Sequence, residues 1–176
     1  MSDHSLPKSI DPFKYADQSK VLEGSLSVHL LDRAVEMLAG SQGSIAVRLE
    51  FGRDEQNIRV LKGTLSTRVA LECQRCLEAV EKDIHSEFAL GIVLSDEQAK
   101  HLPKDYEPLL VESDKVDLFE VIEEELILSL PMFAYHDACS AHDESGKSER
   151  IEHNEQESEP KRPNPFSVLS DLKLKK

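Results

Sequence analysis

Alternation between apolar and polar residues dominates the middle of the chain and predicts β-strands there. Large apolar residues occupy every second position from 45 to 51, and the run ends at a Gly-Arg-Asp stretch. The same period of two recurs over 58–71, where Gly63 is expected to form a turn or a bulge, and over 80–94. Strands so closely spaced along the chain predict an antiparallel sheet that curls partly into a barrel.

Shorter elements are predicted on either side of these strands. A strand is expected over 23–31, followed by a helix over 32–39 in which apolar residues recur at helical spacing. Residues 95–101 are expected to begin with a helical turn, and 106–111 to add another strand. The polar, proline-punctuated residues 1–20 are expected to lie along the core as an extended arm.

One long helix is predicted from Asp117 to Leu130. Asp117 is a suitable N-cap, and Pro131 stops the helix after Leu130. The apolar face of this helix is expected to pack on the sheet. Its solvent side is expected to carry three glutamates, which are Glu120, Glu123 and Glu124. The predicted fold class is therefore α+β, with this helix on a partly barrel-like antiparallel sheet in a single domain, residues 1–141.

The C-terminal part of the chain has a different composition. Residues 142–162 contain almost no large apolar side chain, so burial cannot offset the entropy of ordering them, and they are predicted to form a flexible acidic linker. In 163–176, Phe166, Leu169 and Leu172 recur every three residues beside a lysine-rich end. This pattern predicts an apolar and basic docking segment for this domain or for a partner. A C-terminal helix that closes the core is the alternative.

The charge balance narrows the classes of partner. The chain has 34 acidic and 21 basic residues and a net charge of −13 at pH 7. Nucleic-acid backbones repel such a protein, so broad, sequence-independent nucleic-acid binding is not expected. An acidic body attracts basic partner proteins, although plain solubility explains the same charge. No apolar stretch approaches the roughly 20 residues of a membrane helix, and no signal peptide is evident, so a cytoplasmic protein without a membrane partner is predicted.

The sharpest local feature is a Cys-x-x-Cys pair, Cys73 and Cys76. Two cysteines at this spacing can direct both sulfurs to one tetrahedral zinc ion. A complete site needs two more ligands, and the chain offers them from either of two pairs. One pair is His136 with Cys139, and the other is Cys139 with His142. No cofactor other than such a zinc ion is expected.

Three other interpretations of the Cys73 and Cys76 pair remain open. The first is a reduced β-turn without metal. A disulfide is disfavoured in a reducing compartment and leaves one of the three cysteines unpaired. A thioredoxin-like redox pair needs a strand that leads into a helix, which this β-rich stretch does not predict. Phosphate-binding loops and nucleophile motifs are absent from the sequence, so no catalytic residue or small-molecule substrate is predicted.

Four blocks of sequence resemble the YceD family. They span 71–77, 105–108, 116–131 and 163–169, in the same order and at similar spacing across nearly the whole chain. The resemblance implies a non-enzymatic ribosome biogenesis factor that supports synthesis, processing or accumulation of large-subunit (23S) ribosomal RNA. Many family members carry a second cysteine pair after the helix, whereas this chain offers only Cys139 between two histidines.

The partners implied by the resemblance are a ribosomal RNA precursor or a large-subunit ribosomal protein. Sequence-specific RNA recognition usually stacks bases on exposed aromatic side chains, and aromatics make up only 5% of this chain. The sequence therefore leaves RNA and protein open as the direct contact. The residues predicted to bind a partner are Arg75, Phe166, Leu169 and Leu172. The alternative function is a thiol- or metal-dependent enzyme centred on Cys73 and Cys76.

Overall fold

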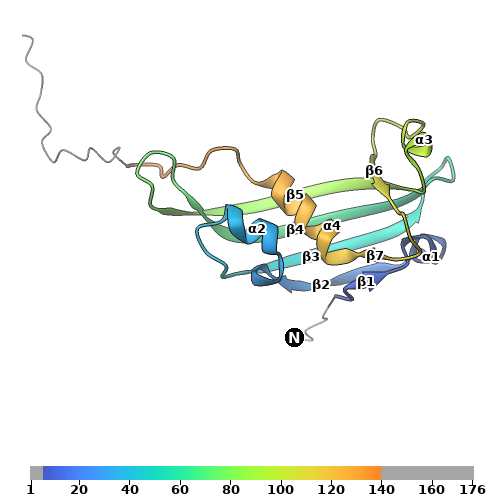
Figure 1. Cartoon of the computed structure of the whole chain (residues 1–176), viewed down its shortest axis with the longest axis horizontal. Coiled ribbons are helices and arrows are strands. Elements are labelled where there is room, and N and C mark those ends of the chain that lie inside the picture. Colours follow the sequence, from blue (N-terminus) through green and yellow to red (C-terminus); the bar gives the residue numbers. More distant parts are fainter. Residues whose placement is uncertain (1–5, 140–176) are drawn as a thin grey trace, which may run out of the picture. The chain divides into compact units, whose positions relative to one another are not determined.

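A five-stranded sheet forms the frame of the domain in this computed structural model, which describes residues 6–139 (Figure 1). The strand order is β2-β3-β4-β5-β6, and all neighbours are antiparallel except β5 and β6, which are parallel. The strands are β2 (Val21–Ser27), β3 (Ser44–Arg53), β4 (Arg59–Glu72), β5 (Ala79–Val93) and β6 (Glu107–Leu110). The predicted antiparallel strands are therefore largely confirmed.

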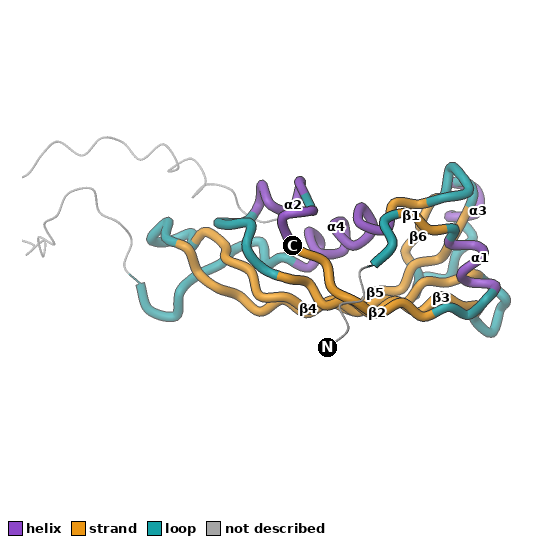
Figure 2. The backbone as a smooth tube through the Cα atoms, turned by 90° about the horizontal axis from the view of Figure 1, so that it is seen from below, coloured by secondary structure: helices purple, strands orange, loops and turns teal. Residues whose placement is uncertain are grey.

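Short elements and one longer helix complete the domain. A two-stranded sheet pairs β1 (Ser9–Ile10) with β7 (Val116–Asp117). The helices are α1 (Pro12–Asp17), the 3-10 helix η1 (Val28–Leu30), α2 (Asp32–Met37), α3 (Asp96–Ala99) and α4 (Leu118–Ser129). Helices α2 and α4 lie on the same side of the large sheet (Figure 2). Within residues 6–139, no helix has the length and apolar character needed to span a membrane.

The alternation along the strands separates a buried face from an exposed one. In β3, large apolar side chains such as Ile45 and Leu49 are buried, whereas Arg48 and Glu50 are exposed on the opposite face. Helix α4 packs its apolar side chains on the buried face of the sheet. The Asp117 carboxylate caps the first turn of this helix, since its Oδ1 accepts a hydrogen bond from the Phe119 N–H at 2.9 Å. The predicted packing of this helix on the sheet is confirmed.

The predicted barrel is wrong, because the sheet is open. Strands β2 and β6 end the sheet without pairing with each other, and no strand of residues 6–139 joins these two edges. The prediction for Gly63 is also wrong, since β4 passes through this residue without a turn or a bulge. Gly63 instead makes room for the Phe88 ring on the neighbouring strand, because a Cβ at Gly63 would lie 2.1 Å from the ring's Cζ.

Two shorter predictions are corrected as well. The expected extended arm is interrupted by helix α1. Asp11 caps this helix, because its Oδ1 accepts a hydrogen bond from the Lys14 N–H at 2.9 Å. Pro12 suits the first turn of the helix. The strand expected over 23–31 ends at Ser27, and η1 begins at Val28.

The burial of Glu123 contradicts its predicted position on the solvent side of α4. Its Oε1 accepts a hydrogen bond from the Ala34 N–H at 3.0 Å, in the first turn of α2. That N–H has no partner within its own helix, so the carboxylate of a packed neighbouring helix satisfies it. Glu120 and Glu124 are exposed as predicted.

Candidate metal centre

The first half of the candidate site is the loop that joins β4 to β5. It is closed by two short backbone bonds, from the Cys73 N–H to the Glu78 carbonyl and from the Leu77 N–H to the Cys73 carbonyl, both at 2.8 Å. Leu77 adopts the left-handed conformation with φ 61°, which completes the sharp reversal of the chain. Cys73 and Cys76 are both buried in this loop.

The second half arrives from the segment after α4, which lies beside the loop (Figure 1). The Gln74 N–H donates to the Ala134 carbonyl at 2.9 Å, and Cys73 forms an isolated parallel β-bridge with Ala134. These backbone contacts fix the register of the segment against the loop. They carry His136 and Cys139 to the two cysteines.

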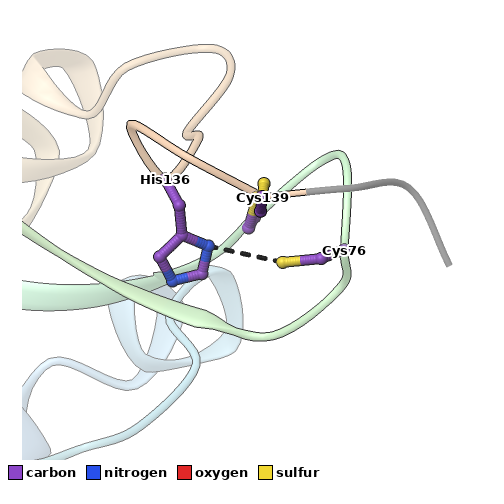
Figure 3. A group of neighbouring side chains, drawn as sticks. Cys76, His136 and Cys139 are labelled. Atoms are coloured by element: carbon purple, nitrogen blue, oxygen red, sulfur yellow. Dashed lines mark hydrogen bonds between the residues drawn. The ribbon is translucent and has the colours of Figure 1, made fainter.

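Four potential ligand atoms converge at this point. Sγ of Cys73 lies 3.6 Å from Sγ of Cys139, and Sγ of Cys76 lies 3.3 Å from Nδ1 of His136, whose ring faces Cys76 in Figure 3. All four atoms lie within 4.8 Å of one another. In a tetrahedral zinc site, ligands at their usual bond lengths are about 3.3 to 3.8 Å apart. The cluster therefore fits a four-coordinate zinc ion of three sulfurs and one nitrogen after only small shifts.

The orientation of the His136 ring is set by a second hydrogen bond. Nε2 lies 3.1 Å from the carbonyl oxygen of Ala79, the first residue of β5. A carbonyl oxygen can only accept, so Nε2 carries the proton and donates it. The lone pair of Nδ1 is then left facing Cys76, which is the arrangement that a metal-binding histidine needs.

The backbone around Cys73 favours its thiolate. Burial raises the pKa of the Cys73 thiol, but the backbone N–H groups of Cys76, Arg75 and His136 outweigh burial and lower this pKa to about 5. The pKa of the Cys139 thiol is raised. The larger cause is burial, and the next is the hydrogen bond with Cys73. Zinc binds cysteine as the thiolate, so the lowered pKa of Cys73 favours it as a metal ligand.

Of the two ligand pairs that the sequence offers, the structure brings His136 and Cys139 to the loop, while His142 lies outside the described residues. Arg75 donates from Nη1 to the Cys139 carbonyl at 3.1 Å, and its guanidinium lies 5.5 Å from the centre of the Tyr135 ring. Both contacts stay within the cluster, so a partner contact by Arg75 stays a prediction. The predicted docking residues Phe166, Leu169 and Leu172 also lie outside the described part of the chain.

The sequence did not identify two further contributors to the site. The Ala79 carbonyl orients His136, and the Tyr135 ring supports Arg75. A backbone carbonyl leaves no mark in a sequence. Tyr135 stands beside His136, but an aromatic residue next to a potential ligand is too common a pattern to have indicated its role.

These observations define a class of protein. It is an α+β protein with an open sheet and a Cys/His cluster that lies between the β4–β5 loop and the segment after α4. The family described as "Large ribosomal RNA subunit accumulation protein YceD" matches residues 61–173. A Haemophilus influenzae protein with the same name is 36% identical over 171 residues, which cover 97% of each chain. The chain therefore belongs to the YceD family, as the four sequence blocks indicated. No solved structure matches it.

Proposed function

We propose that this protein is a non-enzymatic, cytoplasmic ribosome biogenesis factor that supports the accumulation of large-subunit (23S) ribosomal RNA. The observation that carries this proposal is the match to a relative of that name along 97% of both chains. The protein acts by binding a ribosomal RNA precursor or a large-subunit ribosomal protein. The net charge of −13 favours a basic protein as the direct partner.

The burial of the cysteines supports binding rather than thiol catalysis. Cys73 is 0% exposed and Cys76 is 7% exposed. A nucleophilic or redox-active cysteine needs access to its substrate, whereas buried cysteines usually have structural roles. The alternative of a thiol-dependent enzyme is therefore disfavoured.

The role proposed for the Cys/His cluster is a structural zinc site formed by Cys73, Cys76, His136 and Cys139. Four protein ligands leave no open coordination position, which is typical of structural rather than catalytic zinc. The ion would join the β4–β5 loop to the segment that follows α4. It would thereby hold the last described residues of the domain in place.

Loss of the gene is expected to lower the ratio of mature 23S to 16S ribosomal RNA in the source organism, because the factor supports only the large-subunit RNA. The measurement is RNA quantification across a growth curve, together with sucrose-gradient profiles of the subunits. A plasmid copy of the full chain should restore the ratio, and an empty plasmid is the control. An unchanged ratio, or an equal loss of both RNAs, contradicts the proposed function.

Deletion of 163–176 is expected to leave the domain stable and to impair its function. The family match extends to residue 173, so it includes most of this segment, where Phe166, Leu169 and Leu172 are proposed to dock. Thermal unfolding should change by less than about 2 °C, because a docking segment would add nothing to the apolar core that residues 6–139 form among themselves. The 23S to 16S ratio should fall as it does without the gene. A melting temperature lowered by many degrees would instead assign the segment to the core.

A further inference from the structure

One edge of the large sheet is open along most of β5. Strand β6 pairs only with the end of β5, from Leu90 to Val93. From Ala79 to Ala89, β5 has β4 on one side and, among residues 6–139, no strand on the other. Such an edge can accept an additional strand.

The hydrogen-bonding groups of this edge can be assigned from the pairing. Glu78 bonds toward Cys73 on the β4 side, and in an antiparallel pair the bonding direction alternates from residue to residue. The carbonyl of the next residue, Ala79, accordingly points outward and accepts from His136. The N–H and C=O groups that face the open edge farther along β5 belong to Glu81, Asp83, His85 and Glu87.

A groove runs beside this edge, with α4 and the segment after it as the opposite wall. A hollow of about 560 Å³ is lined by Lys82 to His85 on one side and by Phe133 and Tyr135 on the other. A second hollow of about 700 Å³ borders Ser86 to Ala89 and Leu128 of α4, and it also extends over Arg48, Lys62 and Thr64 of the neighbouring strands β3 and β4. Both are lined by Ser129. Together the two hollows border β5 from Lys82 to Ala89, and they are called the groove from here on.

The wall opposite β5 exposes an unusual amount of apolar surface. Leu128 is 70% exposed, Phe133 62% and Tyr135 42%. Exposed apolar side chains grouped beside a free strand edge are typical of surfaces that bind another chain. An edge that was only protected against aggregation would carry charges without this apolar wall.

The lining of the groove contains seven acidic residues and four basic ones, and the basic ones are Arg48, Lys62, Lys82 and Lys104. Glu81, Asp83 and Glu87 project from the outer face of β5, and Asp137 lines the far end of the groove. Asp83 is paired with Arg68 at 2.6 Å, and Lys82 is a basic residue on the inner side. The remaining carboxylates favour a partner segment with lysine or arginine side chains.

We propose that this groove binds an extended, basic segment of a large-subunit ribosomal protein, which adds to β5 as a further strand; the choice of partner rests on the proposed function. Its backbone would bond to the outward N–H and C=O groups of β5. Alternate side chains would pack on Leu128, Phe133 and Tyr135, and basic ones would meet Glu81 and Glu87. The backbone bonds supply affinity, and the apolar wall and acidic face supply selectivity.

The test uses an array of peptides of about ten residues, one strand length, that tile the large-subunit ribosomal proteins. The full chain is expected to bind a subset with alternating apolar and basic residues. His85→Pro removes one outward N–H but no bond to β4, so it should weaken binding of the selected peptides at least about tenfold while the protein stays folded. His85→Thr keeps the N–H and is the matched control, with binding expected to change less than about twofold.

A second pair of variants probes the other wall, in case proline disturbs the strand. Leu128→Lys places a positive charge against the basic peptide and should also weaken binding. Leu94→Lys changes another exposed leucine that lies outside the groove and should have no effect. Both variants should melt at the temperature of the unmodified chain, because neither leucine is buried.

Three outcomes would overturn the inference. In the first, no peptide of the array binds. In the second, the selected peptides bind His85→Pro and Leu128→Lys as well as they bind the unmodified chain. In the third, the protein forms a concentration-dependent dimer that His85→Pro abolishes, which would assign the groove to a second copy. The 23S to 16S ratio in cells lacking the gene is measured independently. If that ratio falls while the array fails, the groove proposal is wrong and the proposed function stands.

Discussion

Protein purified without a metal-binding tag is expected to contain about one equivalent of zinc, and Cys76→Ser is expected to lose it. The serine hydroxyl is a poor zinc ligand. Without the Cys76 thiolate, three of the four proposed ligands remain, which are Cys73, His136 and Cys139. A structural zinc ion contributes its binding free energy to folding. The variant is therefore expected to lose about 3 kcal/mol of unfolding free energy, which corresponds to a melting temperature lowered by about 10 °C.

The matched control for this substitution is Gln74→Ser. Gln74 lies between the two cysteines, and its backbone N–H, which serine keeps, makes the bond to Ala134. Within residues 6–139, the Gln74 side chain makes only a 3.4 Å bond to the Glu72 carbonyl. Zinc content measured by elemental analysis and the melting temperature should both stay close to those of the unmodified chain. Less than about a tenth of an equivalent of zinc in the unmodified chain would support reduced cysteines without metal.

The strands were predictable because their burial is local in origin. In β3 every second side chain faces the core, so the period of two in the sequence is also the period of burial in the fold. The openness of the sheet is a different kind of property. It depends on where β6 pairs, and the parallel match of Leu90 with Glu107 joins residues that no local pattern relates.

The candidate site divides in the same way. The spacing of Cys73 and Cys76 indicated a loop that can hold a metal, and both residues do lie in one sharp loop. Whether His136 or His142 would complete the set could not be decided from spacing, because each is three residues from Cys139. The backbone contacts of Ala134 with Cys73 and Gln74 bring His136 to the loop, and such long-range contacts have no sequence signature.

The glutamates of α4 illustrate the limit of a helical pattern. Glu123 was assigned to solvent because it is charged, yet the unpaired N–H of Ala34 gives it a partner in the interior. Glu125 lies in the same helix, is only 8% exposed, and has no side-chain hydrogen bond within residues 6–139. Burial first, and then the charges of Glu107 and Glu124, raise the pKa of the Glu125 carboxyl from 4.5 to about 7.

The sign of the pH effect follows from this raised pKa. Below about pH 4.5, Glu125 is protonated in both the folded and the unfolded chain and does not affect the balance between them. Between about pH 4.5 and pH 7 the unfolded chain ionises while the folded chain keeps its proton, so the stability contributed by this group falls as pH rises. Above about pH 7 the folded chain carries the full cost of a poorly solvated carboxylate.

Glu125→Gln is expected to remove this cost and to make the domain more stable at alkaline pH. The gain in unfolding free energy should be about 2 kcal/mol at about pH 8 and only about a quarter of that at about pH 5, once partial solvent screening is allowed for. Urea unfolding at both pH values measures it. Glu120→Gln, at an exposed position of the same helix, is the control and should show no such difference between the two pH values. An equal effect of Glu125→Gln at both pH values would mean that Glu125 titrates as an ordinary solvated carboxylate.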